Sequence, residues 1–326
     1  MPSEPHPQSA QKIAPETGAM TDVIALFKAA QGREPALAAA QLTGALRMVP
    51  GKRALMEGSF AGRRAVFRFY LDAPAKHATR DWAELERTRP YMTEGDLQAH
   101  EGLYTSPEIG LVITSFAEGQ PLMERIWQAV KPARPAMMPP AARWLRKYTR
   151  PTEATAPARL EGWLDRAARR AARQPFEALR PVEAAILAEL HRIAAPMAGK
   201  PWRMAVCHGD FHPNNLLADG PRLTAIDIGG SAKLPIYKDM ARFLAHMGRR
   251  GLDLSGSSRF GADMAGIEAF AEAFALDETE RGIWLPFMLG IEALMRVEAE
   301  FFRKSRLRRS KAFYEALLAD LQAIPL

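Results

Sequence analysis

The sequence predicts an α+β protein built in two parts. Its first third is rich in strand-forming segments, the remainder is mainly helical in pattern, and short apolar strands interrupt the helical part near residues 204–228. A chain of 326 residues suits two domains at about 150 residues each. We therefore expect a tail at 1–20, a first part at 21–116, a connection at 117–120 and a second part at 121–326.

In the first part, the pattern predicts helices at 22–30, 36–41 and 81–89, and strands at 46–49, 54–57, 65–71 and 110–116. The segment 65–71 is the clearest strand, because it is rich in aromatic and β-branched residues. The last helix should end near Pro90, since a residue that precedes proline disfavours the helical conformation. Small and polar residues at 117–121 are typical of a connection.

The second part begins with a proline-rich stretch. Residues 131–157 contain six prolines, which predicts an irregular link around one helix. The predicted helices lie at 141–148, 159–173, 181–195 and from 237 onward, and the predicted strands at 204–207 and 223–228. One buried helix face is expected from Trp284, Met288, Ile291 and Met295, which recur at helical spacing.

Composition excludes several classes of protein. Hydrophobic residues make up 48% and charged residues 25%, which is ordinary for a globular chain and excludes disorder throughout. No apolar run approaches the ~18 residues of a membrane-spanning helix. Residues 1–10 hold three prolines and no Lys or Arg, unlike a secretory signal, so a cytoplasmic location is expected. The single cysteine, Cys207, excludes an internal disulfide and a cysteine cluster for zinc.

The net charge of +7 is concentrated in one segment. Residues 131–180 hold twelve Lys or Arg against four acids. Such a segment can meet phosphates, acidic lipids or nucleic acid, or it can form solvated helix faces. Aromatic residues are not interleaved with the charges, so no nucleic-acid partner is expected.

The chemistry-bearing segment joins two short apolar strands. Asp210 and Asn215 follow the first strand, five residues apart, and Asp227 follows the second. Strand ends hold polar groups rigidly. An amide and a carboxylate oxygen suit Mg²⁺, while a separate carboxylate can accept a proton from an attacking hydroxyl. This combination favours phosphoryl transfer.

The same stretch resembles a kinase catalytic loop. His208-Gly209-Asp210 through Asn215 is similar to the His-x-Asp-x-x-x-x-Asn motif, and Asp227-Ile228-Gly229 to the metal-binding Asp-x-Gly that follows it. Glycine at 209 and the Asp-Ile-Gly variant resemble the aminoglycoside phosphotransferase family, whose superfamily includes choline kinases. The segment from Lys238 to Leu244 resembles that family's Asp-x-Ala-x-x-Leu helix. The resemblance implies a bilobal protein-kinase-like fold, with ATP and Mg²⁺ in the cleft.

The resemblance also implies roles for individual residues of the second lobe. Asp210 is the catalytic base, and Asn215 and Asp227 bind the metal. His208 organises the loop, and Asp239 supports it.

In the first lobe, the resemblance aligns the strand Ala65-Val66-Phe67-Arg68 with the strand whose end carries a phosphate-binding lysine. Arg68 occupies that position here. Arginine can neutralise phosphate, although the two cations are not interchangeable at a fixed site. A helix glutamate should pair with Arg68, and we expect Glu84, with Glu86 as the alternative.

Two further segments are expected to contact the nucleotide. Gly51 and Lys52 lie where the first hairpin would cover the phosphates, although the spacing is not that of a Walker loop. Ser115, Phe116 and Ala117 would border the adenine.

The sequence thus predicts ATP-dependent transfer of a phosphoryl group to a hydroxyl of a small molecule. The basic segment 131–180 argues against a polycationic acceptor, so a neutral or anionic acceptor is expected. One alternative is a nucleotide-binding regulator without transfer activity, for which Arg68 is the support. Another is a kinase of a protein or a lipid headgroup that uses the basic surfaces.

Overall fold

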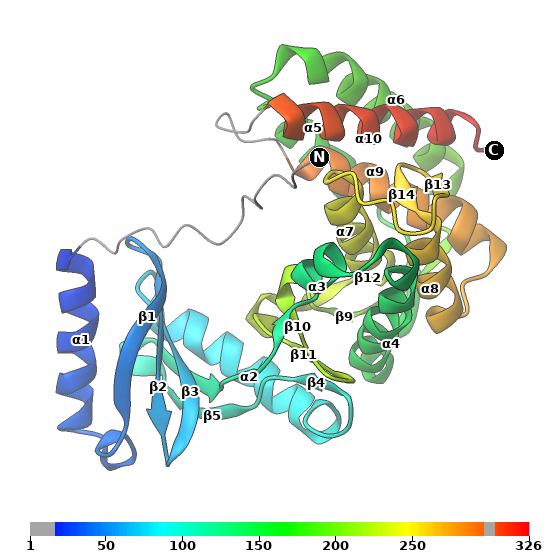
Figure 1. The fold of residues 1–326 in the computed structure, drawn as a ribbon. Coiled ribbons are helices and arrows are strands. Elements are labelled where there is room, and N and C mark those ends of the chain that lie inside the picture. The colour runs from blue at the N-terminus through cyan, green and yellow to red at the C-terminus, as the bar shows by residue number, and fades with distance from the viewer. Residues whose placement is uncertain (1–16, 297–303, 326) are drawn as a thin grey trace. The chain divides into compact units, whose positions relative to one another are not determined.

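The computed structural model describes residues 17–296 and 304–325, and their contacts divide the chain into two compact units (Figure 1). Among the described residues, unit 1 comprises 17–93 and 99–117, and unit 2 comprises 94–98 and everything from 118 onward. Up to residue 16, the predicted tail lies outside the described residues. From Thr17 the chain is helical, so the last residues assigned to the tail belong to the first helix.

Unit 1 is an antiparallel five-stranded sheet with helices packed on it, and the strand order is β1-β2-β3-β6-β5. Its strands are β1 (Gln41–Val49), β2 (Arg53–Phe60), β3 (Arg63–Tyr70), β5 (Gly102–Ser106) and β6 (Leu111–Ser115). Its helices are α1 (Thr17–Gln31) and α2 (Pro74–Met92), with short 3₁₀ turns at Pro35–Leu37 and Pro107–Ile109.

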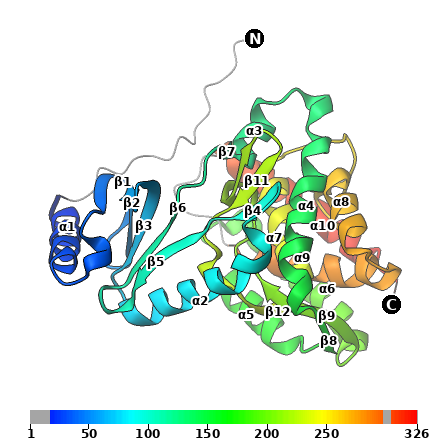
Figure 2. The ribbon, with the colours of Figure 1, turned by 90° about the horizontal axis from the view of Figure 1, so that it is seen from below.

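Successive side chains of β3 point to opposite faces of this sheet, and a different helix packs on each face. Phe67 and Phe69 point to one face, where the ring of Phe27 from α1 meets both of them edge-on. Arg68 points to the other face and reaches Asp81 of α2. Figure 2 shows α1 and α2 on different sides of the strands. The strand therefore buries aromatic rings on one side and a charged pair on the other.

Most predicted elements of unit 1 coincide with observed ones, and one prediction was wrong. The helix α2 includes Pro90 and ends two residues later at Met92, near the predicted end. Residues 36–41 do not form a helix, since the 3₁₀ turn ends at Leu37 and β1 begins at Gln41. The strand β5 was not predicted.

Unit 2 is a helical assembly with small antiparallel sheets. Its helices are α3 (Leu122–Gln128), α4 (Met138–Thr149), α5 (Glu161–Ala171), α6 (Arg180–Met197), α7 (Tyr237–Gly248), α8 (Met264–Phe274), α9 (Leu285–Met295, after a π-helical segment at Glu280–Trp284) and α10 (Lys304–Gln322). Its strands are β4 (Leu97–Ala99), β7 (Gln120–Pro121), β8 (Ala154–Pro157), β9 (Pro201–Cys207), β10 (Leu216–Asp219), β11 (Arg222–Ala225), β12 (Ala232–Pro235), β13 (Ser258–Arg259) and β14 (Ala262–Asp263). Helices α5, α6 and α10 lie together in Figure 1.

The strands of unit 2 form sheets ordered β4-β11-β10-β7 and β12-β9-β8, plus the β13–β14 pair. That last pair interrupts the helical stretch predicted from residue 237 onward. The strand predicted at 223–228 ends at Ala225, because Asp227 takes a left-handed conformation that a strand does not accommodate.

The core of unit 2 holds an aromatic stack directly beneath the loop that follows β9. Phe211 is fully buried and stacks on Trp144 at 5.5 Å and on Phe243 at 5.4 Å between ring centroids. Phe270 meets Phe243 edge-on. Burying such rings contributes a few kcal/mol each, about the cost of a Phe-to-Ala change in a core. Phe211 therefore anchors the segment that carries the candidate catalytic residues.

The predicted buried face of α9 is confirmed for Trp284, Met288 and Ile291, and Met295 at its end is partly exposed.

Candidate active site

The buried side chain of His208 joins the two loops that carry the predicted residues. Its Nε2 lies 3.1 Å from the carbonyl oxygen of Ile226, and its Nδ1 accepts a hydrogen bond from the backbone N–H of Asp210 at 3.4 Å. Because Nδ1 accepts, Nε2 carries the proton and donates to Ile226. His208 thereby connects the residue before Asp227 to Asp210, as an organising residue would.

Gly209 has a conformation and surroundings that suit only glycine. Its φ is +84°, and a Cβ added there would lie 2.8 Å from the carbonyl oxygen of Gly230. Its N–H donates to both carboxylate oxygens of the buried Asp239, at 3.1 and 3.2 Å, and its carbonyl accepts from Lys238 Nζ at 2.8 Å. Two consecutive residues of α7 therefore fix the peptide groups on either side of Gly209.

Asp210 projects from this loop with 43% of its side chain exposed. Its Oδ1 accepts hydrogen bonds from Arg242 Nε at 2.9 Å and from Arg296 Nη2 at 3.2 Å, and its Oδ2 lies 3.5 Å from His212 Nε2. Burial raises the pKa of this carboxyl, but the contact with His212 and the charges of both arginines outweigh that effect. The pKa therefore lies well below its usual range, and Asp210 stays ionised at neutral pH.

Two histidines pack beside this carboxylate. The rings of His212 and His246 stack at 4.5 Å, and His246 Nε2 lies 3.4 Å from the side-chain amide nitrogen of Asn214. Burial lowers the pKa of both histidines below the usual value, for His212 against the opposing effect of Asp210. Both are therefore neutral at neutral pH, and the cations next to Asp210 are the arginines.

The amide of Asn215 is oriented so that its oxygen remains available. Its Nδ2 donates to the backbone carbonyl oxygen of Asp210 at 3.0 Å, and the backbone carbonyl of Asn215 accepts from the N–H of Ile226 at 3.0 Å. Among the described residues, nothing donates to the Asn215 side-chain oxygen. This oxygen and the half-buried carboxylate of Asp227 are hard ligands of the kind that Mg²⁺ takes, so the donor set fits that ion.

Arg68 in unit 1 pairs with Asp81, a residue that the sequence analysis did not name. Its Nη1 donates to Asp81 Oδ2 at 3.1 Å, and Tyr70 donates to the same oxygen at 2.8 Å. Burial and the Asp81 carboxylate raise the pKa of Tyr70, to about 12, against the effect of Arg68. The phenol therefore keeps its proton and can donate.

The expected partners of Arg68, Glu84 or otherwise Glu86, each make an ion pair within α2, and the pairing of Glu84 with Arg68 stays a prediction. Glu84 accepts hydrogen bonds from Arg87 on both carboxylate oxygens, and Glu86 pairs with Arg89. Each of these partners lies one helical turn away and competes for its glutamate. Asp81 lies on the helix face that carries Glu84, but one turn earlier.

The remaining predicted nucleotide residues also lie in unit 1. Gly51 occupies the β1–β2 turn with a φ of +65°, and the carbonyl of Lys52 accepts from the N–H of Leu71 at 2.8 Å. Ser115 Oγ accepts from the N–H of Glu101 at 2.9 Å.

At the end of this unit, the guanidinium of Arg64 lies 3.4 Å from the ring centroid of Phe116. Ala117 is the last residue assigned to unit 1. Unit 1 thus carries the predicted nucleotide contacts, and unit 2 carries Asp210, Asn215 and Asp227.

Two functional candidates were missed by the sequence analysis, namely Arg242 and Arg296. Arg242 lies three residues after Asp239, so the helix itself places both side chains toward the same loop. This spacing could have identified Arg242 from the sequence as a residue that faces the loop. Arg296 follows the end of α9, 86 positions after Asp210, and no local pattern connects the two.

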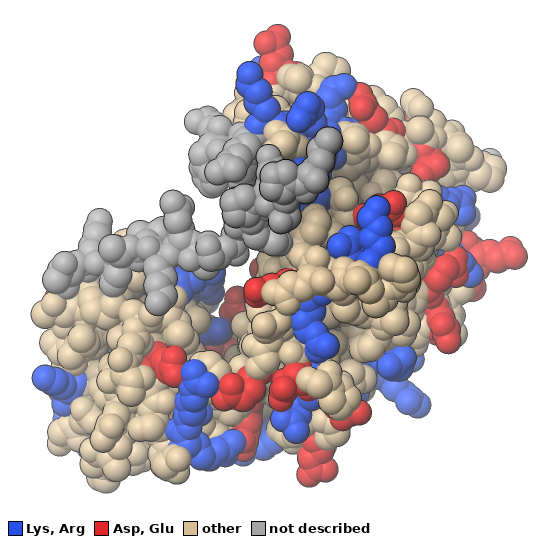
Figure 3. All heavy atoms as spheres, in the orientation of Figure 1, with Lys and Arg blue, Asp and Glu red and all other residues tan. Residues whose placement is uncertain are grey.

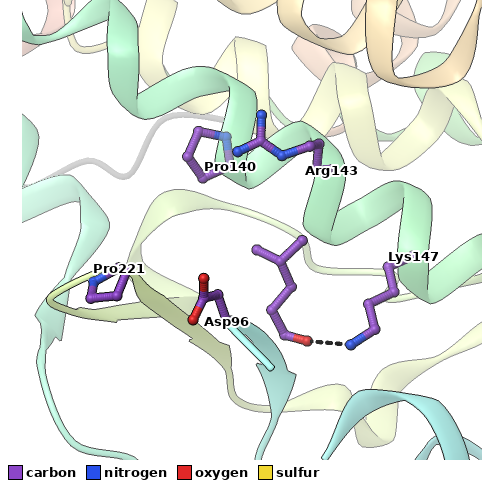
Figure 4. A pocket seen from close by; sticks show the side chains of 6 residues that line it. Asp96, Pro140, Arg143, Lys147 and Pro221 are labelled. Atoms are coloured by element: carbon purple, nitrogen blue, oxygen red, sulfur yellow. Dashed lines mark hydrogen bonds between the residues drawn. The ribbon is translucent and has the colours of Figure 1, made fainter. Parts of the chain in front are cut away.

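A separate pocket of about 530 Å³ lies in unit 2 between α4 and the β10–β11 turn (Figure 4). It is lined by Asp96, Leu97, Pro140, Arg143, Lys147 and Pro221. Lys147 Nζ donates to the carbonyl of Leu97 at 2.9 Å, the bond drawn in the figure. None of the predicted site residues lines this pocket.

Among the described residues, no helix has both the length and the apolar composition needed to cross a membrane.

Comparisons with known proteins place the fold. The model of the phosphotransferase enzyme family, APH, matches residues 56–275. No curated protein sequence matches the chain. Among solved structures, a choline/ethanolamine kinase family protein from Mesorhizobium loti has a TM-score of 0.60 at 16% identity, over 93% of this chain and 99% of that chain.

Aminoglycoside phosphotransferase APH(4)-Ia has a TM-score of 0.53 at 16% identity, over 93% of this chain and 98% of that chain. A thermostable mutant of that enzyme, solved as a ternary complex with ADP and hygromycin B, has a TM-score of 0.52 at 14% identity, over 91% and 97% of the two chains. These likenesses confirm the predicted kinase-like α+β fold, with β-rich sheets first and helices after. The family model covers more than half of the chain, from β2 to the end of α8, and includes the whole loop around Asp210. This chain belongs to the phosphotransferase enzyme family.

Proposed function

We propose that this protein transfers the γ-phosphoryl group of ATP to a hydroxyl group of a small molecule. The observation that carries the proposal is the loop after β9, in which Asp210 is held exposed and ionised while His208 and Asn215 tie it to the segment that ends in Asp227. Phosphoryl transfer needs positioning and charge neutralisation more than covalent chemistry, and this loop would position both the base and the ligands of the neutralising metal.

The roles follow from the atoms that each residue presents. Asp210 orients the acceptor hydroxyl and takes its proton as the bond to phosphorus forms. The side-chain oxygens of Asn215 and Asp227 would hold Mg²⁺, which neutralises the phosphate charge when bound. Asp239 and His208 touch no substrate and hold the loop in place.

The nucleotide contacts are assigned to unit 1. Arg68 is proposed to bind phosphate, with Asp81 and Tyr70 fixing its guanidinium. Gly51 and Lys52 are proposed to contact phosphate, and the segment from Ser115 to Ala117 to contact the adenine. The complex of the APH(4)-Ia mutant with ADP supports a nucleotide in this fold.

The test is ATP binding followed by transfer. A thermal-stability shift that requires both ATP and Mg²⁺ is expected, together with ADP release that depends on a hydroxylated acceptor and stops when EDTA removes the metal. Asp210→Asn should lower kcat by about 10²- to 10⁴-fold, because the amide cannot take the proton, while the ATP-induced shift is retained.

A matched control is Asp219→Asn, which changes an exposed acid in the β10–β11 hairpin of the same unit. It should behave like the unmodified protein. Full activity of Asp210→Asn would refute the base assignment, and a nucleotide-induced shift without transfer to any acceptor would favour the regulator.

A further inference from the structure

The carboxylate of Asp210 lies between two guanidinium groups that come from different helices. Arg242, in α7, donates through Nε at 2.9 Å, and Arg296, just after α9, donates through Nη2 at 3.2 Å, both to Oδ1. The side chain of Arg242 is 12% exposed and that of Arg296 is 39% exposed. Arg242 is therefore largely buried, and Arg296 lies at the surface next to the candidate base.

A second carboxylate, that of Glu292, lies close to Arg296. Glu292 is almost fully buried and lies 3.3 Å from Lys238 Nζ and 3.7 Å from Arg296 Nε. The two guanidinium groups of Arg242 and Arg296 therefore face the single carboxylate of Asp210, at the edge of the site where the acceptor hydroxyl must arrive.

Such a site discriminates between acceptors by charge. A hydroxyl must come within hydrogen-bond distance of Asp210. A cationic group on the neighbouring carbons would then meet Arg242 and Arg296 and be repelled. An anionic group would instead accept hydrogen bonds from the guanidinium of Arg296, which Asp210 itself shows to be positioned for a carboxylate oxygen.

We propose that the acceptor is a hydroxylated anion, whose carboxylate or phosphate group binds Arg296 and Arg242 while a nearby hydroxyl meets Asp210. This inference rests on the proposed phosphotransferase function. The two arginines on which it depends, Arg242 and Arg296, lie outside the basic segment 131–180. No atom is transferred beyond the phosphoryl group already described, since the anionic group serves only for recognition.

The experiment uses one carbon skeleton with different charges. Glucose, gluconate, glucose 6-phosphate and glucosamine are each tested at saturating MgATP for ADP release and, separately, for binding by calorimetry. We expect at least one of the two anions to exceed glucose in kcat/KM by about 10-fold or more, as a charge-assisted hydrogen bond provides, and glucosamine to be the poorest. The better anion identifies carboxylate or phosphate as the group recognised.

Variants test whether the arginines are responsible. Arg296→Gln should raise the KM for the preferred anion by about 10- to 100-fold and change the KM for glucose far less. Arg242→Lys keeps the charge but loses the planar fork, and should give a smaller rise. Arg281→Gln is the matched control, because this exposed arginine of unit 2 pairs with Glu268, away from Asp210.

The outcomes separate the two proposals. MgATP binding with a preference for glucosamine or glucose, or with no binding of either anion, would refute the anionic acceptor and leave the phosphotransferase function standing. Equal losses for glucose and the anion in Arg296→Gln would also refute it. Absence of MgATP binding would refute the function on which the inference rests.

Discussion

The ion pair between Arg68 and Asp81 is buried, with 8% and 2% of the two side chains exposed. Taking two charges out of water is costly, so each depends on the other and on Tyr70 for compensation. Among the three carboxylates of α2, Asp81 is the most deeply buried, so its pair with Arg68 is the best shielded from water.

Asp81→Ala should therefore destabilise the protein by about 3 kcal/mol, because it leaves the Arg68 guanidinium without this carboxylate in a buried position. Glu86→Ala is the matched control on the same helix. Its exposed pair with Arg89 is worth less than about 1 kcal/mol. Urea unfolding of both variants measures the difference, and equal losses would show that Asp81 is not the residue that compensates Arg68.

His246 makes stability depend on pH. It is buried, it stacks on His212, and the charges of Arg250, Arg242 and Arg306 add to burial in lowering its pKa. A histidine whose pKa is lowered by folding stabilises the protein fully above the unfolded value of about 6.5, and this contribution is lost as the pH falls below it.

The unmodified protein should lose about 1.4 kcal/mol per pH unit more than His246→Gln between roughly pH 6.5 and pH 5. Unfolding free energies from urea titrations across that range test this expectation. Parallel curves for the two proteins would mean that His246 is protonated as readily in the folded state as in the unfolded chain.

At the scale of elements, the loop after β9 is shaped by its glycine. Gly209 combines a φ of +84° with a carbonyl oxygen that a Cβ would approach to 2.8 Å. In the same unit, Gly220 has a φ of +56° but open space where a Cβ would lie. A side chain at Gly220 would therefore cause backbone strain alone, whereas one at Gly209 would cause both backbone strain and a steric collision.

Gly220→Ala should cost about 1 kcal/mol through its backbone conformation alone and keep full activity. Gly209→Ala should cost about 1–3 kcal/mol and lower kcat at least tenfold, because relieving the collision displaces Asp210. Thermal unfolding and ADP release measured on both variants provide the test. Full activity of Gly209→Ala would show that the loop tolerates the shift.

The sequence predicted these elements to different extents. The strand at 65–71 was recognisable from its aromatic and β-branched residues. The loop around Asp210 was recognisable from a short motif whose residues lie close together in the sequence. Strand β5 was missed because Gly102–Ser106 has no clean alternation, and its hydrogen bonds come from β6 rather than from its own propensity. The pairing of Arg296 with Asp210 depends on how α9 packs against α7, which no short pattern in the sequence encodes.

At the scale of the whole molecule, both signs of charge reach the surface. On the face shown in Figure 3, Lys and Arg are interspersed with Asp and Glu. Several basic residues of 131–180 bind the chain itself: Lys147 donates to two carbonyls, Arg134 to two others, and Arg180 to the carbonyl of Gln174. These three residues therefore take part in the fold and keep their positive charge, because a carbonyl group does not neutralise a cation. The net charge of +7 acts as a general field.

That field should assist an anionic acceptor and not a neutral one. Raising the KCl concentration from about 0.01 M to about 0.1 M shortens the screening length from about 30 Å to about 10 Å. At saturating MgATP, kcat/KM for the preferred anion should then fall severalfold, while the value for glucose stays nearly constant, because only a charged ligand is steered. Arg296→Gln should lower the starting value for the anion yet keep part of its salt dependence, since the remaining charges still act at long range. An identical salt response for glucose and the anion would mean that the charge of the acceptor contributes nothing to its capture.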